Sequence, residues 1–235
     1  VMRLLHIYPD LMNLYGEYAN VRVMERFLLE QGAQVTTETL SLYDTRDISG
    51  YDFYFMGAGT ERNQKLALSQ LAVHRDAIAA AIQAGKVLLF TGNAWELLGR
   101  AVTDASGHRF EALGLAAFET TESKKRIVGD AIAYYGEKPL VGFVNKCSVT
   151  SGVANPFLHM ALGFGNEAEC GPEGWHEKNL YATHLTGPVL VKNPALLREL
   201  AGLLLGGRLP DDCPMWPSME RAFAVDFDEL SRRLP

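Results

Sequence analysis

Strand-like runs that alternate with helical segments are the feature that most constrains the fold of this chain. The runs are short and rich in β-branched or aromatic residues, and they cover residues 4–8, 34–40, 51–56 and 86–90. Apolar residues at helical spacing lie between them, at Val21, Met24 and Leu28 and again at Leu68, Leu71, Ile78 and Ile82. This alternation predicts an α/β domain with a parallel sheet between layers of helices.

Three loops follow strand ends, and each is a candidate for binding a ligand. They cover residues 9–16, 57–63 and 91–94. Ligands of parallel sheets bind outside the carboxyl ends of the strands, where such loops meet. The glycines of Gly57-Ala58-Gly59 indicate a close approach of the backbone. These three residues either line a pocket or form the tight turn that any parallel sheet requires.

The middle of the chain follows a different pattern. Residues 101–166 contain shorter β-like pieces, such as 126–128 and 140–144, between polar turns. Helical periodicity is weak there. The pattern predicts an antiparallel extension or a small second sheet.

Helical signals return towards the C-terminus. A strand-like run over 180–190 precedes Asn193-Pro194, which we expect to be the N-cap and first residue of a leucine-rich helix. We expect residues 1–207 to form one domain and 208–235 to form a tail. A short helix over 219–234 is predicted within that tail.

Composition excludes several classes of function. Hydrophobic residues make up 48% and charged residues 21% of the chain, as in ordinary globular proteins. The net charge of −6 disfavours a nucleic-acid partner, because affinity for phosphate backbones depends on clustered cations. No apolar run is long enough to cross a bilayer, so we expect a cytoplasmic protein with no membrane partner.

The cysteines and histidines do not have the spacing of a metal site. The three cysteines, Cys147, Cys170 and Cys213, are an odd number and form no CxxC pair. His159 and His176 share no metal-ligand spacing with each other or with the later His184. We therefore expect no disulfide framework, no metal and no cofactor.

Six sequence blocks resemble a known family both in their residues and in their order along the chain. The blocks are HIYPDLMNLYGEYANVRVMERFL (6–28), GAGTERNQ (57–64), GLAAFETTESKKRIVGD (114–130), GFVNKCS (142–148), GFGNEAECGPEGWHEKN (163–179) and HLTGPVLVKNP (184–194). They are similar to class I glutamine amidotransferases of the cobyric acid synthase (CobB/CobQ) and GatD type. The resemblance implies a flavodoxin-like, three-layer fold with a mostly parallel sheet and a small antiparallel extension.

The resemblance also implies a chemistry. In this family a cysteine thiolate attacks the side-chain amide of glutamine, a histidine moves the proton, and backbone N–H groups stabilise the oxyanion. The ammonia passes to a partner that activates a carboxylate with ATP, here expected to be a Mur-ligase-like subunit. By the same resemblance, the loop at Gly57 gives an oxyanion-hole N–H. Arg126 would hold the α-carboxylate of glutamine or of another small ligand; alternatively, it is a solvated surface arginine.

Two positions depart from the family pattern. Alignment of Trp95–Gly99 with the helix after the family's nucleophile places the cysteine position on Gly92. Alignment of the closing block places the histidine position on Thr186, two residues after His184. Two residues along a strand return to the same face, so His184 is the candidate catalytic base.

Other residues could replace the missing groups. Thr91 is a candidate nucleophile, although its hydroxyl needs a strong adjacent base; alternatively, Thr91 or Asn93 caps the following helix. Together, Thr91, Gly92 and Asn93 could hold an anion at that helix N-terminus. Cys147 is expected to be an ordinary half-buried thiol.

Three hypotheses about function follow. The first is an amidotransferase-like subunit that lacks the usual glutaminase chemistry and works with the Mur-ligase-like partner. The second is an active amidotransferase that supplies ammonia for a cell-wall precursor or a corrinoid through another nucleophile. The third is a small-molecule sensor.

Overall fold

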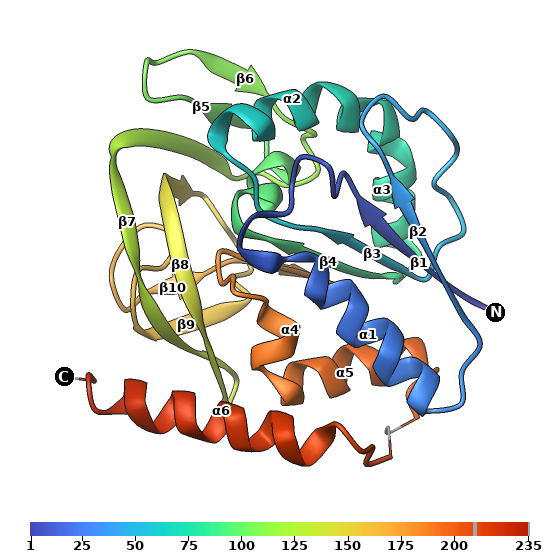
Figure 1. Cartoon of the computed structure of the whole chain (residues 1–235). Helices are drawn as coiled ribbons and strands as arrows, with labels where there is room; N and C mark the ends of the chain where they lie inside the picture. The colour runs from blue at the N-terminus through green and yellow to red at the C-terminus, as the bar shows by residue number, and fades with distance from the viewer. Residues whose placement is uncertain (209–210, 235) are drawn as a thin grey trace.

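The computed structural model describes residues 1–208 and 211–234, and it contains two six-stranded sheets (Figure 1). The first sheet has the strand order β11-β12-β4-β3-β1-β2. Its strands are β1 (Met2–Ile7), β2 (Val35–Leu40), β3 (Phe53–Met56), β4 (Val87–Thr91), β11 (Trp175–Glu177) and β12 (Leu180–Thr183). All neighbouring pairs are parallel except β11 and β12, which confirms the mostly parallel sheet.

Helices cover both faces of the first sheet (Figure 1). The helices on one face are α2 (Glu61–Leu71) and α3 (Arg75–Gln83), and those on the other are α1 (Tyr18–Glu30), α4 (Val189–Lys192) and α5 (Pro194–Leu204). Successive strand residues point to opposite faces. Leu5 and Tyr54 therefore belong to the core under α2 and α3, whereas Leu4 and Phe53 belong to the core under α1 and α5. The predicted three-layer arrangement is confirmed.

The second sheet is built on the long antiparallel hairpin of β7 (Glu119–Tyr135) and β8 (Lys138–Ser151). Its other strands are β5 (Ala101–Thr103), β6 (Arg109–Glu111), β9 (Leu158–Leu162) and β10 (Pro172–Glu173). This sheet is larger than the small extension that the sequence predicted, and the pieces at 126–128 and 140–144 are parts of the two long strands. A break in register between Glu122 and Ile127 interrupts their pairing, and such a bulge hides one long strand from a periodicity search.

Two predicted elements are shorter than expected. The helical face after Gln64 belongs to two helices, because a 3-10 turn, η2 (Ala72–His74), separates α2 from α3. The strand-like run at 180–190 ends as a strand at Thr183, and α4 follows. Gly187 has a φ of +88° and Pro188 has no N–H to donate, so neither residue can continue a strand ladder.

The helix α5 begins with Pro194 as predicted, but Asn193 does not cap it with its side chain. Instead, Asn193 Nδ2 donates to the carbonyl of Val141 at 2.8 Å, and the N–H of Val141 donates to Asn193 Oδ1 at 2.7 Å. The amide side chain therefore fixes the start of α5 to β8 of the second sheet.

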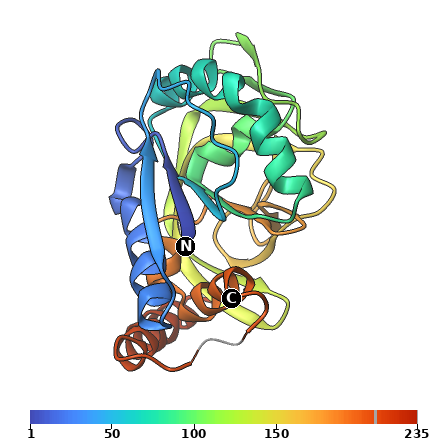
Figure 2. The same cartoon turned by 90° about the vertical axis from the view of Figure 1, so that its right-hand side faces the viewer.

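The predicted terminal helix is α6 (Trp216–Ser231), which lies across the second sheet at the end of the molecule opposite to β5 and β6 (Figure 2). Leu230 packs against Ile132 and Val141, and Phe223 and Phe227 join that cluster. The division into a domain of 1–207 and a tail of 208–235 stays a prediction, and residues 209, 210 and 235 of that tail lie outside the described residues. None of the helices in the described ranges is both long and apolar enough to cross a membrane.

Candidate functional site

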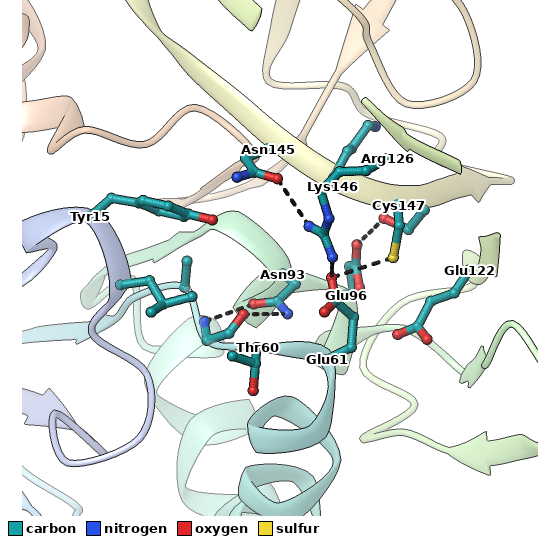
Figure 3. Close-up of a pocket in the computed structure, with 14 residues that line it drawn as sticks. Tyr15, Thr60, Glu61, Asn93, Glu96, Glu122, Arg126, Asn145, Lys146 and Cys147 are labelled. Atoms are coloured by element: carbon teal, nitrogen blue, oxygen red, sulfur yellow. Dashed lines mark hydrogen bonds and ion pairs between the residues drawn. The ribbon is translucent and has the colours of Figure 1, made fainter. Parts of the chain in front are cut away.

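A cavity of about 260 Å³ opens where the carboxyl ends of the parallel strands face the second sheet (Figure 3). Its walls come from the loop after β1, the start of α2, the 3-10 helix η3 (Gly92–Leu98), and the strands β7 and β8. The lining residues are Leu14, Tyr15, Ala58, Gly59, Thr60, Glu61, Asn93, Glu96, Glu122, Arg126, Asn145, Lys146, Cys147 and Ser148. The loops predicted from the first sheet thus form only half of the site.

The turn after β4 has the geometry of a sharp strand-to-helix elbow. Gly92 has a φ of +58°, a left-handed conformation that glycine adopts without strain. A Cβ added to Gly92 would overlap the Cβ of Ala58, and it would lie 3.2 Å from Ala58 Cα and 3.4 Å from Thr186 Cγ2. No side chain fits at this position unless Ala58 changes or moves. The helix that follows is a 3-10 helix and not the α-helix expected after the elbow.

Neither Thr91 nor Asn93 caps η3 through its side chain. The buried Thr91 hydroxyl donates to Glu17 Oε2. Asn93 bonds to both backbone groups of Gly59, accepting from its N–H and donating to its carbonyl, each at 3.0 Å.

Of the predicted ligand-binding residues, Ala58, Gly59, Asn93 and Arg126 line the cavity. Gly57, Thr91 and Gly92 are not among the lining residues.

Glu17 is a fully buried carboxyl that the sequence interpretation missed. It follows the loop after β1, and its Oε1 accepts a hydrogen bond from the N–H of Gly187 at 3.2 Å. Burial raises the pKa of Glu17 to about 7, although the bonds from Thr91 and Gly187 oppose that rise. A Cβ on Gly57 would lie 2.7 Å from Glu17 Cβ, so glycine at position 57 makes room for this carboxyl.

His184 lies behind the cavity, between two buried carboxylates. Its Nε2 is 3.0 Å from Glu96 Oε1, and its Nδ1 is 3.2 Å from Glu173 Oε1. Burial alone would raise the pKa of both glutamates, but the hydrogen bonds and charge of His184 lower both values. His184 thus bridges the two buried carboxyl groups through its two ring nitrogens. Of these three residues, Glu96 alone lines the cavity.

Thr186, where the sequence alignment predicts the family's histidine position, is also buried and does not line the cavity. Its hydroxyl donates to the carbonyl of Phe143 at 3.0 Å, and the two backbones form an isolated bridge. Thr186 therefore joins the end of the first sheet to β8.

Arg126 and Glu61 form an ion pair at the cavity wall. Arg126 Nη2 is 2.6 Å from Glu61 Oε1, and Arg126 Nη1 donates to Asn145 Oδ1 at 2.9 Å (Figure 3). Cys147 Sγ lies 3.3 Å from the same Glu61 oxygen. Burial first, and then the neighbouring Glu61 carboxylate, raise the pKa of Cys147 to about 11. The thiol is thus protonated at neutral pH.

The sequence predicted the lining residues that follow strands of the first sheet, but it missed most of those on β7 and β8. Glu61 and Tyr15 lie within family-like blocks, and these blocks were the available signal. Glu122 also lies in such a block and Glu96 lies in the aligned segment Trp95–Gly99, but both were missed, because their contacts join segments far apart in the chain. Lys146 also went unnoticed; it is buried, and its Nζ donates to the carbonyl of Gly165 at 2.6 Å. In residues 1–208 and 211–234, no three His, Cys, Asp or Glu side chains are grouped as a metal site would require.

A family model and two curated relatives are similar to this chain in sequence. Residues 3–194 match the family described as the CobB/CobQ-like glutamine amidotransferase domain. The chain is 30% identical over 234 residues to the lipid II isoglutaminyl synthase (glutamine-hydrolyzing) subunit GatD of Streptococcus pneumoniae, covering 97% of this chain and 89% of that protein. It is 29% identical over 191 residues to the GatD subunit of Staphylococcus aureus, covering 80% and 78%.

Solved structures share the fold. PurLQS from Thermotoga maritima aligns with a TM-score of 0.53 at 12% identity, over 95% of this chain and 98% of that one. A crystal structure of a glutamine amidotransferase aligns with a TM-score of 0.54 at 12% identity, over 84% and 98%. At this identity the likeness concerns the arrangement of the backbone alone.

Proposed function

The chain belongs to the family of CobB/CobQ-like glutamine amidotransferase domains, and we propose that within this family it is a subunit without the usual glutaminase chemistry. Its role would be to bind a partner and to hold a small polar ligand in the cavity beside η3. The family membership gives the setting for this proposal. The residues at the elbow give the reason for it.

One observation carries the proposal: the elbow has no room for a nucleophile. The reaction needs a thiolate on a sharp turn, where a helix N-terminus lowers its pKa. Here Gly92 keeps the left-handed turn, but the Cβ of Ala58 takes up the space that a side chain would need. A cysteine at position 92 would therefore require a change at position 58 as well.

The remaining candidate nucleophiles are poorly placed. Cys147 lines the cavity, yet its pKa of about 11 leaves very little thiolate at neutral pH. The hydroxyl of Thr91 donates to Glu17, whose pKa of about 7 would suit a general base. This contact is the observation that favours the second candidate function, an active amidotransferase with Thr91 as nucleophile. Both groups are fully buried and outside the cavity lining, so a substrate in the cavity does not reach them.

The relatives support an assembly with a second protein. Both GatD proteins are named as subunits of lipid II isoglutaminyl synthase. We propose that the present chain likewise binds a Mur-ligase-like, ATP-dependent subunit that activates a carboxylate. In this arrangement the chain would position its partner or sense the ligand, and any ammonia would come from another source.

The test is glutamine hydrolysis by the purified chain, with and without a Mur-ligase-like subunit of the kind that the proposal requires. A glutamine-mimicking electrophile, followed by mass spectrometry, would locate any reactive side chain. We expect no ammonia release and no adduct, together with a stable complex of the two proteins. Hydrolysis with an adduct on Thr91 would refute the proposal and establish the second candidate. Absence of both hydrolysis and complex formation would favour the sensor.

A further inference from the structure

The guanidinium of Arg126 already forms hydrogen bonds with side chains of this protein. A carboxylate ligand would have to compete with these side chains for it. One Nη donates to Glu61 and the other to Asn145, at 2.6 and 2.9 Å (Figure 3). Glu61 also accepts from the thiol of Cys147, so this carboxylate has partners on both β7 and β8. Its pKa is lowered below the ordinary value, because the bonds and charge of Arg126 together with its other hydrogen bonds outweigh the effect of burial.

The segment that presents Arg126 is not held by the sheet. Pairing of β7 with β8 stops at Glu122 and resumes at Ile127 with a changed register. The backbone of residues 123–126 therefore lacks the ladder bonds that fix its neighbours. Side chains hold it instead: Lys65 of α2 pairs with Glu122, and Arg126 contacts Glu61 of α2 and Asn145 of β8. Glu61 and Lys65 are four residues apart on one face of α2, so the two ion pairs lie side by side at the cavity.

We propose that Glu61 acts as an internal stand-in for a ligand carboxylate and thereby selects which ligands the cavity accepts. A ligand with a carboxylate must displace Glu61 from Arg126, whereas an uncharged amide can enter without breaking this pair. The cavity thus discriminates against carboxylates in favour of neutral, hydrogen-bonding ligands. This inference rests on the proposed function, in which the cavity binds a ligand without hydrolysing it.

The exposure of the pair sets the size of the effect. The side chains of Arg126 and Glu61 are 43% and 33% exposed, so water screens their attraction. Pairs with such exposure contribute about a fivefold factor or less to an equilibrium. Removal of Glu61 also removes a negative charge that repels an incoming carboxylate. Together these effects predict a gain of about five- to tenfold in affinity for a carboxylate ligand.

The experiment compares two probes of the same size. Glutaramate carries one carboxylate and one amide, whereas glutaramide carries two amides. Their dissociation constants are measured by calorimetry or by NMR titration with the wild-type chain and with Glu61→Gln. We expect glutaramate to bind Glu61→Gln about five- to tenfold more tightly than wild type, with little change for glutaramide.

Two controls separate this role from general electrostatics. Glu122→Gln removes the same charge from the same cavity wall, but Glu122 pairs with Lys65 and not with Arg126. It should leave the glutaramate-to-glutaramide preference within about twofold of wild type. In an Arg126→Gln background, Glu61→Gln should change this preference by about twofold or less, because the pair is already broken and only the charge repulsion remains.

An equal change for both probes would overturn the inference, and so would an equal shift in Glu122→Gln. Failure of Glu61→Gln to bind glutaramate at all would also overturn it, since Glu61 would then not be what excludes carboxylates. These outcomes do not depend on catalysis. The proposed function fails instead if glutamine is hydrolysed, so the two failures can be distinguished.

Discussion

Replacement of Glu17 by glutamine should stabilise the protein at alkaline pH and leave its stability at acidic pH nearly unchanged. Glu17 has a pKa of about 7 in the fold, against an ordinary value of 4.5. The folded state therefore binds the proton more tightly than the unfolded state. The stabilisation that this carboxyl contributes is fully present below pH 4.5 and is lost as the pH rises through 7.

The size of the effect follows from the two pKa values. Each unit of difference corresponds to ~1.4 kcal/mol, so ionisation of Glu17 costs the folded state about 3 kcal/mol by pH 8. Glutamine has the same shape and stays neutral. It can still accept from the N–H of Gly187 and can bond to the Thr91 hydroxyl. We expect Glu17→Gln to exceed wild type in free energy of unfolding by about 2–3 kcal/mol at pH 8 and by less than about 1 kcal/mol at pH 5.

Urea unfolding at both pH values measures this difference. Trp95, Trp175 and Trp216 are all buried and provide a fluorescence signal. Comparison of the two proteins at each pH cancels the contribution of every other titrating group. If the difference between them were the same at pH 5 and pH 8, Glu17 would not titrate in this range, and the argument from burial would be refuted.

Three further predictions concern other parts of the molecule. Gly92→Cys should lower the free energy of unfolding by about 2–4 kcal/mol through overpacking and left-handed strain, and adding Ala58→Gly should recover part of that loss in urea unfolding. His184→Gln should cost about 3–5 kcal/mol in urea unfolding, because it removes the ring that two buried carboxyl groups share as a partner; a loss below about 1 kcal/mol would show that these carboxyl groups do not depend on the ring. Leu230→Ala should cost about 2–3 kcal/mol and raise hydrogen exchange in α6, whereas unchanged exchange there would mean that Leu230 does not hold this helix on the second sheet.

The sequence was sufficient for the first sheet and its helices. Runs such as 51–56 and 86–90 are apolar on both faces, and this pattern has few alternatives to a buried parallel strand. The long hairpin of β7 and β8 was not predictable in the same way. Its strands alternate buried and exposed positions and contain a bulge, so the period of two is broken within one element.

The candidate site was only partly predictable for a different reason. Residues 57–59 and 93 follow strand ends, and topology alone brings such residues together. The hydrogen-bond partners of His184 are Glu96 and Glu173. Nothing local in the sequence indicates that these three side chains meet. The environment that sets a pKa depends on tertiary packing. The raised pKa values of Glu17 and Cys147 could therefore not be predicted from the sequence.

The close approach of Gly92 and Ala58 also restricts how this chain can evolve. A mutation that adds a side chain at position 92 meets the Cβ of Ala58 and is penalised at once. A mutation of Ala58 to glycine gives no benefit by itself, since nothing yet needs the space. A cysteine at position 92 therefore needs a second change, at position 58, before it can be accommodated. Gly92 and Ala58 thus constrain each other, so that a larger residue at position 92 is tolerated only together with a smaller one at position 58.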